Sequence, residues 1–218
     1  MNDRWYNSIR LEVVARDCYA FKDWQPSDPS SVCIVDVGAN AGAFSVMAAE
    51  AFPNAEVFSF ELVKENYDFA VSKLREHKNV KIFNKAMVGS NTPVGLFQHS
   101  SNPGGHKPIF DKDTETYLSS DRFALDYSKT SVDCISFVEF LGENSIDKVD
   151  FLKLDCEGSE YEILFHVDEH GLWDKIERIS MELHGRGDQE QVDRLMKMLN
   201  DNYSKVTVRG TNMVDCER

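Results

Sequence analysis

The chain has 218 residues, of which 42% are hydrophobic and 28% are charged. This length predicts a single domain with a sizeable core, and the apolar fraction excludes a disordered protein. The formal net charge of −13 disfavours nucleic acid and anionic membranes as partners, because a negative surface repels their phosphates.

Signals for membrane insertion, export and disulfide bonding are missing from the sequence. No apolar run approaches the roughly 18 residues of a membrane span, and the charged start lacks the apolar core of a signal peptide. The spacing of the cysteines favours neither a disulfide framework nor a zinc site, and Cys33, inside an apolar run, is interpreted as a small buried side chain. We therefore expect a cytoplasmic protein.

Strands and helices alternate along most of the chain. Residues 1–31 are expected to form a helix and a linker, separate from a domain of residues 32–218, with Leu11, Val14 and Tyr19 on one side of the helix. The predicted strands are Val32–Val37, Glu56–Phe60, Val80–Phe83, Val149–Leu154, Ile176–Leu183 and, as an antiparallel edge, Tyr203–Val208. The predicted helices are Ala43–Phe52, Lys64–His77, Ser159–Val167 and Gln189–Asn200. Such alternation predicts an α/β fold with a mostly parallel sheet.

Residues 90–129 interrupt this alternation. The segment is rich in glycine, proline and serine and has few apolar residues after Phe97. A long irregular insert in a compact domain is more often functional than idle. We interpret it as a loop on the substrate side, where His106 could contact the substrate, with a plain surface excursion as the alternative.

A glycine-containing turn between the first strand and the first helix of this domain is the most informative segment. It reads VDVGANAG over residues 35–42, where Gly38 permits a tight turn and Gly42 permits the helix start to pack close to the strand. The glycine pattern of dinucleotide sites is absent, because Asn40 stands at the second glycine position. A cofactor without phosphates tolerates such a side chain.

Two acidic residues flank this turn. Asp36, directly before it, would oppose a phosphate but suits an ammonium or a sulfonium group. Glu61 follows the second strand and is placed like the acid that accepts hydrogen bonds from ribose hydroxyls in α/β nucleotide sites. The combination favours S-adenosylmethionine over a nicotinamide dinucleotide. The alternative interpretation is a tight turn between strand and helix that binds no cofactor, with both acids solvated.

A second polar cluster is predicted at the carboxyl ends of the fourth and fifth strands. Lys153 and Asp155 share one face of their strand, and a lysine in a central strand is expected to pair with a carboxylate. Open α/β sheets bind ligands at this edge. Four potential ligands or proton carriers are expected to converge there: Asp155, Glu157, Glu182 and His184. No tight ligand spacing supports a metal, so none is predicted, and His166 and His170 lack such a setting.

On these residues the sequence resembles the FkbM family of S-adenosylmethionine-dependent methyltransferases. The resemblance is carried by VDVGANAGAFS (35–45), FSFELVKENYDFAVSKL (58–74), FNKAMVG (83–89), SSNPGG (100–105), VDFLKLDCEGSEYEIL (149–164) and ISMELHG (179–185). It implies a class I methyltransferase fold, which is Rossmann-like, with a mostly parallel seven-stranded sheet in a three-layer α/β/α arrangement. The tail after Val208 is expected to be too short for a complete terminal hairpin.

The resemblance also implies which residues contact the cofactor. Leu62 stands where the family usually has a proline. From the methionine and ribose side to the adenine, the implied residues are Asp36, Gly38, Asn40, Gly42, Asp155, Glu61, Leu62, Ala86 and Met87.

The expected reaction is methylation of a hydroxyl on a small-molecule, sugar or glycan acceptor, as the resemblance implies. An aliphatic hydroxyl is a poor nucleophile at neutral pH, so we expect a general base to assist in-line methyl transfer. His184 is the expected base, and Glu157 or Glu182 is the alternative base or the group that orients the imidazole. A non-catalytic cofactor-binding module and, less favoured, a nicotinamide-dependent oxidoreductase are the alternatives.

Overall fold

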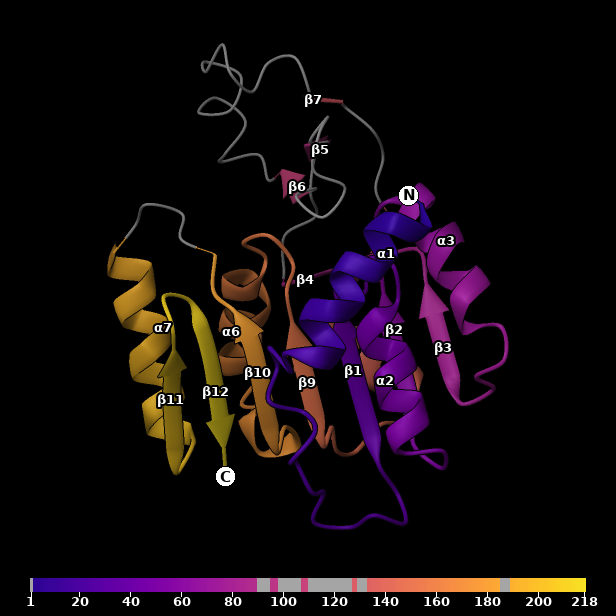
Figure 1. The fold of residues 1–218 in the computed structure, drawn as a ribbon. Helices are drawn as coiled ribbons and strands as arrows, with labels where there is room; N and C mark the ends of the chain where they lie inside the picture. Colours follow the sequence, from indigo (N-terminus) through magenta and orange to yellow (C-terminus); the bar gives the residue numbers. More distant parts are fainter. Residues whose placement is uncertain (1, 90–94, 98–106, 110–126, 129–132, 185–188) are drawn as a thin grey trace.

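The sheet at the centre of the fold has seven strands. The computed structural model describes residues 2–89, 95–97, 107–109, 127–128, 133–184 and 189–218. The strand order is β11-β12-β10-β9-β1-β2-β3, and β12 is antiparallel to both of its neighbours (Figure 1). The bounds are β1 Cys33–Val37, β2 Glu56–Phe60, β3 Val80–Phe83, β9 Phe151–Leu154, β10 Arg178–Glu182, β11 Lys205–Arg209 and β12 Met213–Glu217.

Helices cover both faces of the sheet, which confirms the expected three-layer arrangement. On one face lie α1 Asp3–Arg10 with its continuation η1 Leu11–Ala15, α2 Ala43–Ala51 and α3 Lys64–Leu74. On the other lie α5 Phe137–Glu143, α6 Glu160–Glu169 and α7 Gln189–Asn202, with a short 3₁₀ turn, η2 Trp173–Lys175, after α6. No helix among the described residues combines the length and apolar character needed to cross a bilayer.

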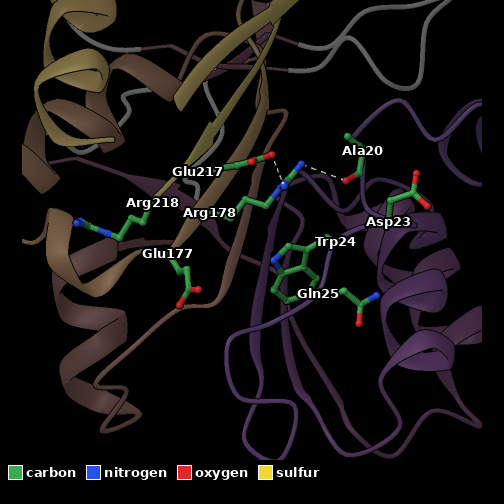
Figure 2. A pocket seen from close by; sticks show the side chains of 8 residues that line it. All are labelled: Ala20, Asp23, Trp24, Gln25, Glu177, Arg178, Glu217 and Arg218. Atoms are coloured by element: carbon green, nitrogen blue, oxygen red, sulfur yellow. Dashed lines mark hydrogen bonds and ion pairs between the residues drawn. The ribbon is translucent and has the colours of Figure 1, made fainter. Parts of the chain in front are cut away.

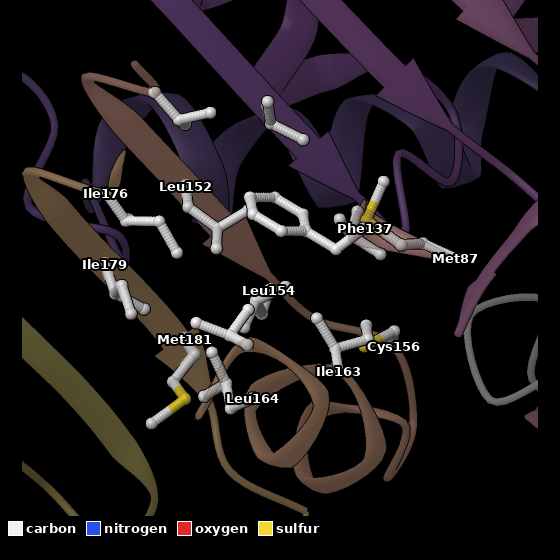
Figure 3. Close-up of a cluster of buried hydrophobic side chains, with 14 of the residues drawn as sticks. Met87, Phe137, Leu152, Leu154, Cys156, Ile163, Leu164, Ile176, Ile179 and Met181 are labelled. Atoms are coloured by element: carbon white, nitrogen blue, oxygen red, sulfur yellow. The ribbon is translucent and has the colours of Figure 1, made fainter. Parts of the chain in front are cut away.

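The main core fills the space between the sheet and α5, α6 and α7. In β9, Leu152 and Leu154 point into it and meet Ile163 and Leu164 of α6 (Figure 3). Side chains alternate along a strand, so Phe151 of β9 points to the opposite face and joins a second core. The two cores explain why the central strands carry apolar side chains on both faces.

The N-terminal segment packs onto the sheet as part of the second core. Val13, Tyr19, Phe21 and Trp24 are buried there. Leu11, which we expected on the packed side of a regular helix, is exposed instead. The reason is that residues 11–15 form a π-helical turn, whose wider winding changes which side chains face the sheet.

A row of polar side chains crosses the sheet on this same face. Five adjacent strands contribute laterally paired, buried residues, namely Ser59, Asp36, Lys153, Ser180 and Asp215. Ser45 of α2 joins the row by donating from its hydroxyl to Asp36 Oδ2 at 2.6 Å. At the other end, the Ser180 hydroxyl donates to Asp215 Oδ1 at 2.7 Å. Hydrogen bonds thus partner these groups inside the protein.

The C-terminal tail forms a complete hairpin, so the expectation that it is too short was wrong. Strands β11 and β12 are joined by three residues, 210–212, and pair along their whole length. Gly210 has a φ of +63°, a conformation that glycine adopts without steric penalty and that permits so tight a turn. The predicted antiparallel edge at residues 203–208 corresponds to β11.

The predicted irregular insert falls mostly outside the described residues. Its described parts are the short strands β5 Gly95–Phe97, β6 Lys107–Ile109 and β7 Tyr127–Ser128, which pair in the order β6-β5-β7. The substrate-side role of the insert stays a prediction, and His106 lies outside the described residues. Beside the insert, β4 Ala86–Val88 pairs in parallel with β8 Cys134–Ser136. Helix α5 starts from a capping box of Ser136 and Glu139, an element that we did not predict.

Candidate functional site

The turn after β1 can be built only around a glycine at position 38. Gly38 has a φ of +78°, and a Cβ atom there would lie 1.8 Å from the carbonyl oxygen of Asp155. The amides of Gly38 and Ala39 both donate to the carbonyl oxygen of Phe60, at 3.0 and 2.9 Å. The turn is therefore pressed between the ends of β9 and β2, which is the tight geometry that the sequence predicted.

Gly42 serves a different contact from the predicted one. A Cβ atom at this position would lie 3.3 Å from Cβ of Ala70 in α3. The glycine therefore allows α2 to approach α3 rather than a strand. Asn40, between the two glycines, has a φ of +52°, and Glu157 across the site has a φ of +55°. Left-handed conformations of non-glycine residues often cluster at functional sites.

Glu61 lies at the end of β2 with both carboxylate oxygens held by backbone amides. Oε2 accepts from the amide of Asn40 at 2.7 Å, and Oε1 accepts from the amide of Val63 at 2.8 Å. Burial raises the pKa of Glu61 to about 7, although both amide hydrogen bonds act to lower it. A carboxylate in this position is poised to accept further hydrogen bonds from hydroxyl donors.

A pocket opens at this carboxyl edge of the sheet. Its lining residues are Gly38, Asn40, Glu61, Leu62, Asn66, Asp155, Cys156 and Glu157. We had not predicted Asn66 or Cys156, and burial raises the pKa of the Cys156 thiol well above its usual range. Asn40 Oδ1 is buried without a hydrogen-bond partner among the described residues, so a donor from a ligand would satisfy it.

The remaining predicted cofactor residues do not line this pocket. Gly42 lies at the α2–α3 contact, and Asp36 is buried beneath the turn. Ala86 packs beside Leu62 in a small apolar cluster. Met87 belongs to the main core (Figure 3). We assign these four residues to the support of the pocket, because the structure buries their side chains or packs them away from it.

Lys153 finds the carboxylate that the sequence predicted for it. Its ammonium group lies 3.0 Å from Asp36 Oδ1 and donates to the carbonyl oxygens of Val37 and Gly38, at 3.2 and 2.7 Å. Burial acts to lower the pKa of Lys153, but the charges of Asp36 and Asp155 and the hydrogen bond to Asp36 together outweigh it, so the pKa is raised. The lysine therefore stays charged and holds the end of β1 at the turn.

Tyr19 reaches the site from the N-terminal segment and was missed by the sequence analysis. Its hydroxyl donates to Asp155 Oδ2 at 2.6 Å. Burial and the adjacent Asp155 charge raise the pKa of Tyr19 well above its ordinary value, so the hydroxyl keeps its proton. Asp155 is thereby fixed at one oxygen, while its other oxygen faces His184.

His184 is oriented by Glu160, another residue that the sequence analysis missed. The carboxylate of Glu160 is fully buried, and its Oε1 lies 3.0 Å from His184 Nδ1 and 2.9 Å from the amide of Cys156. Because a carboxylate only accepts, Nδ1 carries the proton. The expectation that Glu157 or Glu182 orients the imidazole is therefore corrected, since Glu160 does so.

The predicted convergence of acids around His184 is present. Its Nε2 lies 3.9 Å from an oxygen of each of Asp155, Glu157 and Glu182. Glu182 is itself held by the amide group of Asn212, which donates at 2.8 Å. Burial acts to lower the pKa of His184, but the hydrogen bond that His184 donates to Glu160 and the surrounding negative charges raise it to about 9.

A larger cavity lies at the opposite edge of the sheet, where β10 begins (Figure 2). There Arg178 donates to Glu217 at 2.6 Å and to the carbonyl oxygen of Ala20 at 3.2 Å. Figure 2 shows these contacts bridging the C-terminal strand and the N-terminal segment. We interpret this cavity as a structural junction between chain segments.

The residues of the carboxyl-edge pocket fit a positively charged sulfur nucleoside. Glu61 offers oxygens to ribose hydroxyls, and the unpartnered Asn40 Oδ1 offers an acceptor to an ammonium group. Asp155 and Glu157 add negative charge to the pocket, which stabilises a bound sulfonium group and destabilises a bound phosphate. These acceptor groups and negative charges therefore disfavour a dinucleotide, whose phosphates are also negative.

Strand order and site together define the class of protein. The antiparallel β12 between β10 and β11, and the glycine turn followed by an acid after β2, define a class I methyltransferase. The chain belongs to the FkbM methyltransferase family, because the model for the methyltransferase FkbM domain matches residues 36–206. S-adenosylmethionine is therefore the cofactor of this chain.

Two of the named relatives are methyltransferases. The chain is 25% identical over 211 residues to methyltransferase sdnD of Sordaria araneosa, covering 87% of this chain and 79% of the relative. It is 25% identical over 184 residues to methyltransferase 1 of Beauveria bassiana, covering 80% and 72%. A solved structure of a SAM-dependent methyltransferase from Aquifex aeolicus aligns at 12% identity with a TM-score of 0.49, covering 99% of this chain and 97% of that one.

Proposed function

We propose that this methyltransferase methylates a hydroxyl oxygen of a small-molecule or carbohydrate acceptor, with His184 as the general base. The observation that carries the proposal is the orientation of the imidazole by Glu160. With the proton on Nδ1, the lone pair of a neutral ring lies on Nε2, which faces Asp155 at the pocket edge. This is the tautomer that a base needs.

The cofactor supplies a methyl group that sulfonium charge has already activated. The task of the protein is therefore to bind, to align and to remove a proton. The turn at Gly38 and the carboxylate of Glu61 would hold the nucleoside, and Asp155, fixed by Tyr19, would face the charged end. His184 Nε2 would accept the hydroxyl proton as the new carbon–oxygen bond forms.

Charge explains how His184 becomes available as a base at neutral pH. A pKa of about 9 keeps the ring protonated at neutral pH in the free protein. A second positive charge beside Asp155 would lower the pKa of His184 by repulsion. Cofactor binding therefore favours the neutral ring, so that the base is generated when the methyl donor is present.

The test combines labelled product analysis with matched histidine variants. Purified protein is given methyl-¹³C-labelled cofactor and a panel of hydroxylated and amine-bearing compounds, and the labelled product is identified by NMR. We expect label on oxygen, and we expect His184→Ala to lose roughly 10²–10⁴-fold in turnover. His77→Ala, at a turn after α3, is the control and should keep full turnover.

Two outcomes would reject the proposal. Label found on nitrogen or carbon would exclude O-methylation. His184→Ala turnover within about threefold of the parent, with unchanged cofactor affinity by calorimetry, would exclude His184 as the base.

We also propose that neither nucleic acid nor a membrane is a partner of this protein and that the protein works in the cytoplasm. The net charge of −13 supports the first point. All five cysteines are free thiols, which supports a reducing compartment. Retention of the protein on an immobilised nucleic acid at physiological salt would argue against the first point.

A further inference from the structure

Two histidines and a glutamate gather at the last turns of α6. One ligand atom each from His166, Glu169 and His170 lies within 4.8 Å of the other two. Residues four apart share one helix face, and the two imidazole rings have centroids 4.3 Å apart. We propose that this group, the α6 histidine cluster, binds Zn²⁺ or a similar divalent transition-metal ion.

The tautomer of His170 suits metal binding. Its Nδ1 lies 3.0 Å from the carbonyl oxygen of His166, and because a carbonyl only accepts, Nδ1 must donate. The lone pair of the neutral ring is therefore on Nε2. A backbone carbonyl that holds one ring nitrogen while the other binds the ion is the usual arrangement of metal-bound histidines.

The other two ligands are not committed elsewhere. His166 is buried, and its Nδ1 has no hydrogen-bond partner among the described residues. Glu169 is exposed and forms no ion pair within the described part of the chain. Imidazole and carboxylate together suit Zn²⁺, with water completing four ligands.

Small side-chain movements complete the geometry. Ligand atoms around a tetrahedral Zn²⁺ lie roughly 3.3 Å apart when the bonds are near 2.05 Å. The atoms of the α6 histidine cluster lie within 4.8 Å of one another, so each pair must close by at most about 1.5 Å. Glu169 is exposed, so its side chain can rotate inward without disturbing the core or the hydrogen bond that holds His170.

The location separates this cluster from the methyltransferase site. His166 lies six residues beyond Glu160 on the same helix, which is roughly 9 Å along the axis. A metal ion would clamp the end of α6, the helix whose start orients His184. It would therefore act by stabilising the helix, and not on the reacting groups.

The experiment titrates the metal-free full-length protein with Zn²⁺ by calorimetry. We expect one ion per chain, and we expect His170→Ala and Glu169→Gln each to weaken binding by at least about tenfold. Both positions are exposed, so these variants should fold, and circular dichroism checks that they do. His77→Ala, outside the cluster, is the matched control and should bind like the parent.

Two further arms locate the ion. Oxygen and nitrogen atoms of Asp155, Glu182 and His184 also lie within 4.8 Å of one another. Binding that survives His170→Ala but is lost in His184→Ala would place the ion there and overturn the proposal. Titration with Co²⁺ in place of Zn²⁺ tests whether a free thiol is a ligand of the ion. An intense near-ultraviolet band from a Co²⁺–thiolate bond would assign the ion to cysteine and overturn the proposal. The proposal also fails if the parent protein binds no Zn²⁺.

Discussion

Lys153 and Asp36 form an ion pair of 3.0 Å inside the sheet, directly beneath the turn that shapes the pocket. The two residues are lateral partners on neighbouring strands β9 and β1. Because Lys153 also donates to the carbonyl oxygen of Gly38, the pair fixes the turn as well as the strands. The pocket thus depends on a buried pair of charges.

Removing one member of this pair should be strongly destabilising. We expect Lys153→Met to lower the free energy of unfolding by about 3–5 kcal/mol, because Asp36 is left as a buried unpaired charge. The double variant Lys153→Met with Asp36→Asn should recover part of the loss. Lys64→Met, which breaks the exposed Lys64–Asp68 pair, is the control and should change stability by less than about 1 kcal/mol. Urea denaturation measures all four proteins, and equal losses for the buried and exposed pairs would contradict this account.

Gly38→Ala should abolish the pocket. The added Cβ would lie 1.8 Å from the carbonyl oxygen of Asp155. Because that atom is backbone, relief requires moving β9, and we expect a loss of at least about 3 kcal/mol. Gly210→Ala is the matched control, with a φ of +63° and open space around it, and should cost about 1 kcal/mol. Thermal unfolding and cofactor titration report the difference, and comparable losses for the two variants would refute the close-approach explanation.

His184 should titrate near pH 9 in the free protein, and Glu160→Gln should lower that value. Burial acts to lower the pKa of His184, but the Glu160 hydrogen bond and the nearby acids raise it to about 9. A raised histidine pKa stabilises the folded state below the unfolded pKa, near 6.5, and this contribution is lost as pH rises through about 9. NMR titration of the imidazole gives the pKa directly. An ordinary value near 6.5 in the parent protein would show that the acids do not act on the ring.

Glu61 should make cofactor binding depend on pH. Burial raises the pKa of Glu61 to about 7 in the free protein. Ribose hydroxyls donate to the ionised form, so affinity should rise about tenfold from roughly pH 6 to roughly pH 8, with release of a proton. Glu61→Gln should bind more weakly and lose this dependence, because an amide can accept from only one of the two backbone amides. Calorimetry in buffers of different ionisation enthalpy counts the proton, and a pH-independent affinity in the parent would exclude Glu61 as the titrating group.

The sequence predicted the parts of the site that lie close to strand ends. The run before Gly38 and the run before Asp155 are both short and apolar, so their carboxyl edges could be placed together, and the pairing of Lys153 with a carboxylate could be anticipated. The position of Met87 in the main core could not be predicted, because motif position says nothing about the direction of a side chain.

Two residues of the site were beyond sequence reasoning. Tyr19 meets Asp155 across 136 residues, and no local pattern encodes such a contact. Glu160 stands in the first turn of α6, where an acid is ordinarily explained by the helix dipole and by solvent. Only the folded structure shows that this carboxylate is buried against His184.

The polar row across the sheet also restricts how the strands can be assembled. A strand displaced by one residue turns each of its side chains to the opposite face. For β9 such a slip would drive the ammonium group of Lys153 among the leucines and isoleucines of the main core and leave Asp36 without its counter-charge. The buried charges therefore favour the native strand register, and electrostatics as well as packing destabilises sheets of this chain whose strands pair in another register.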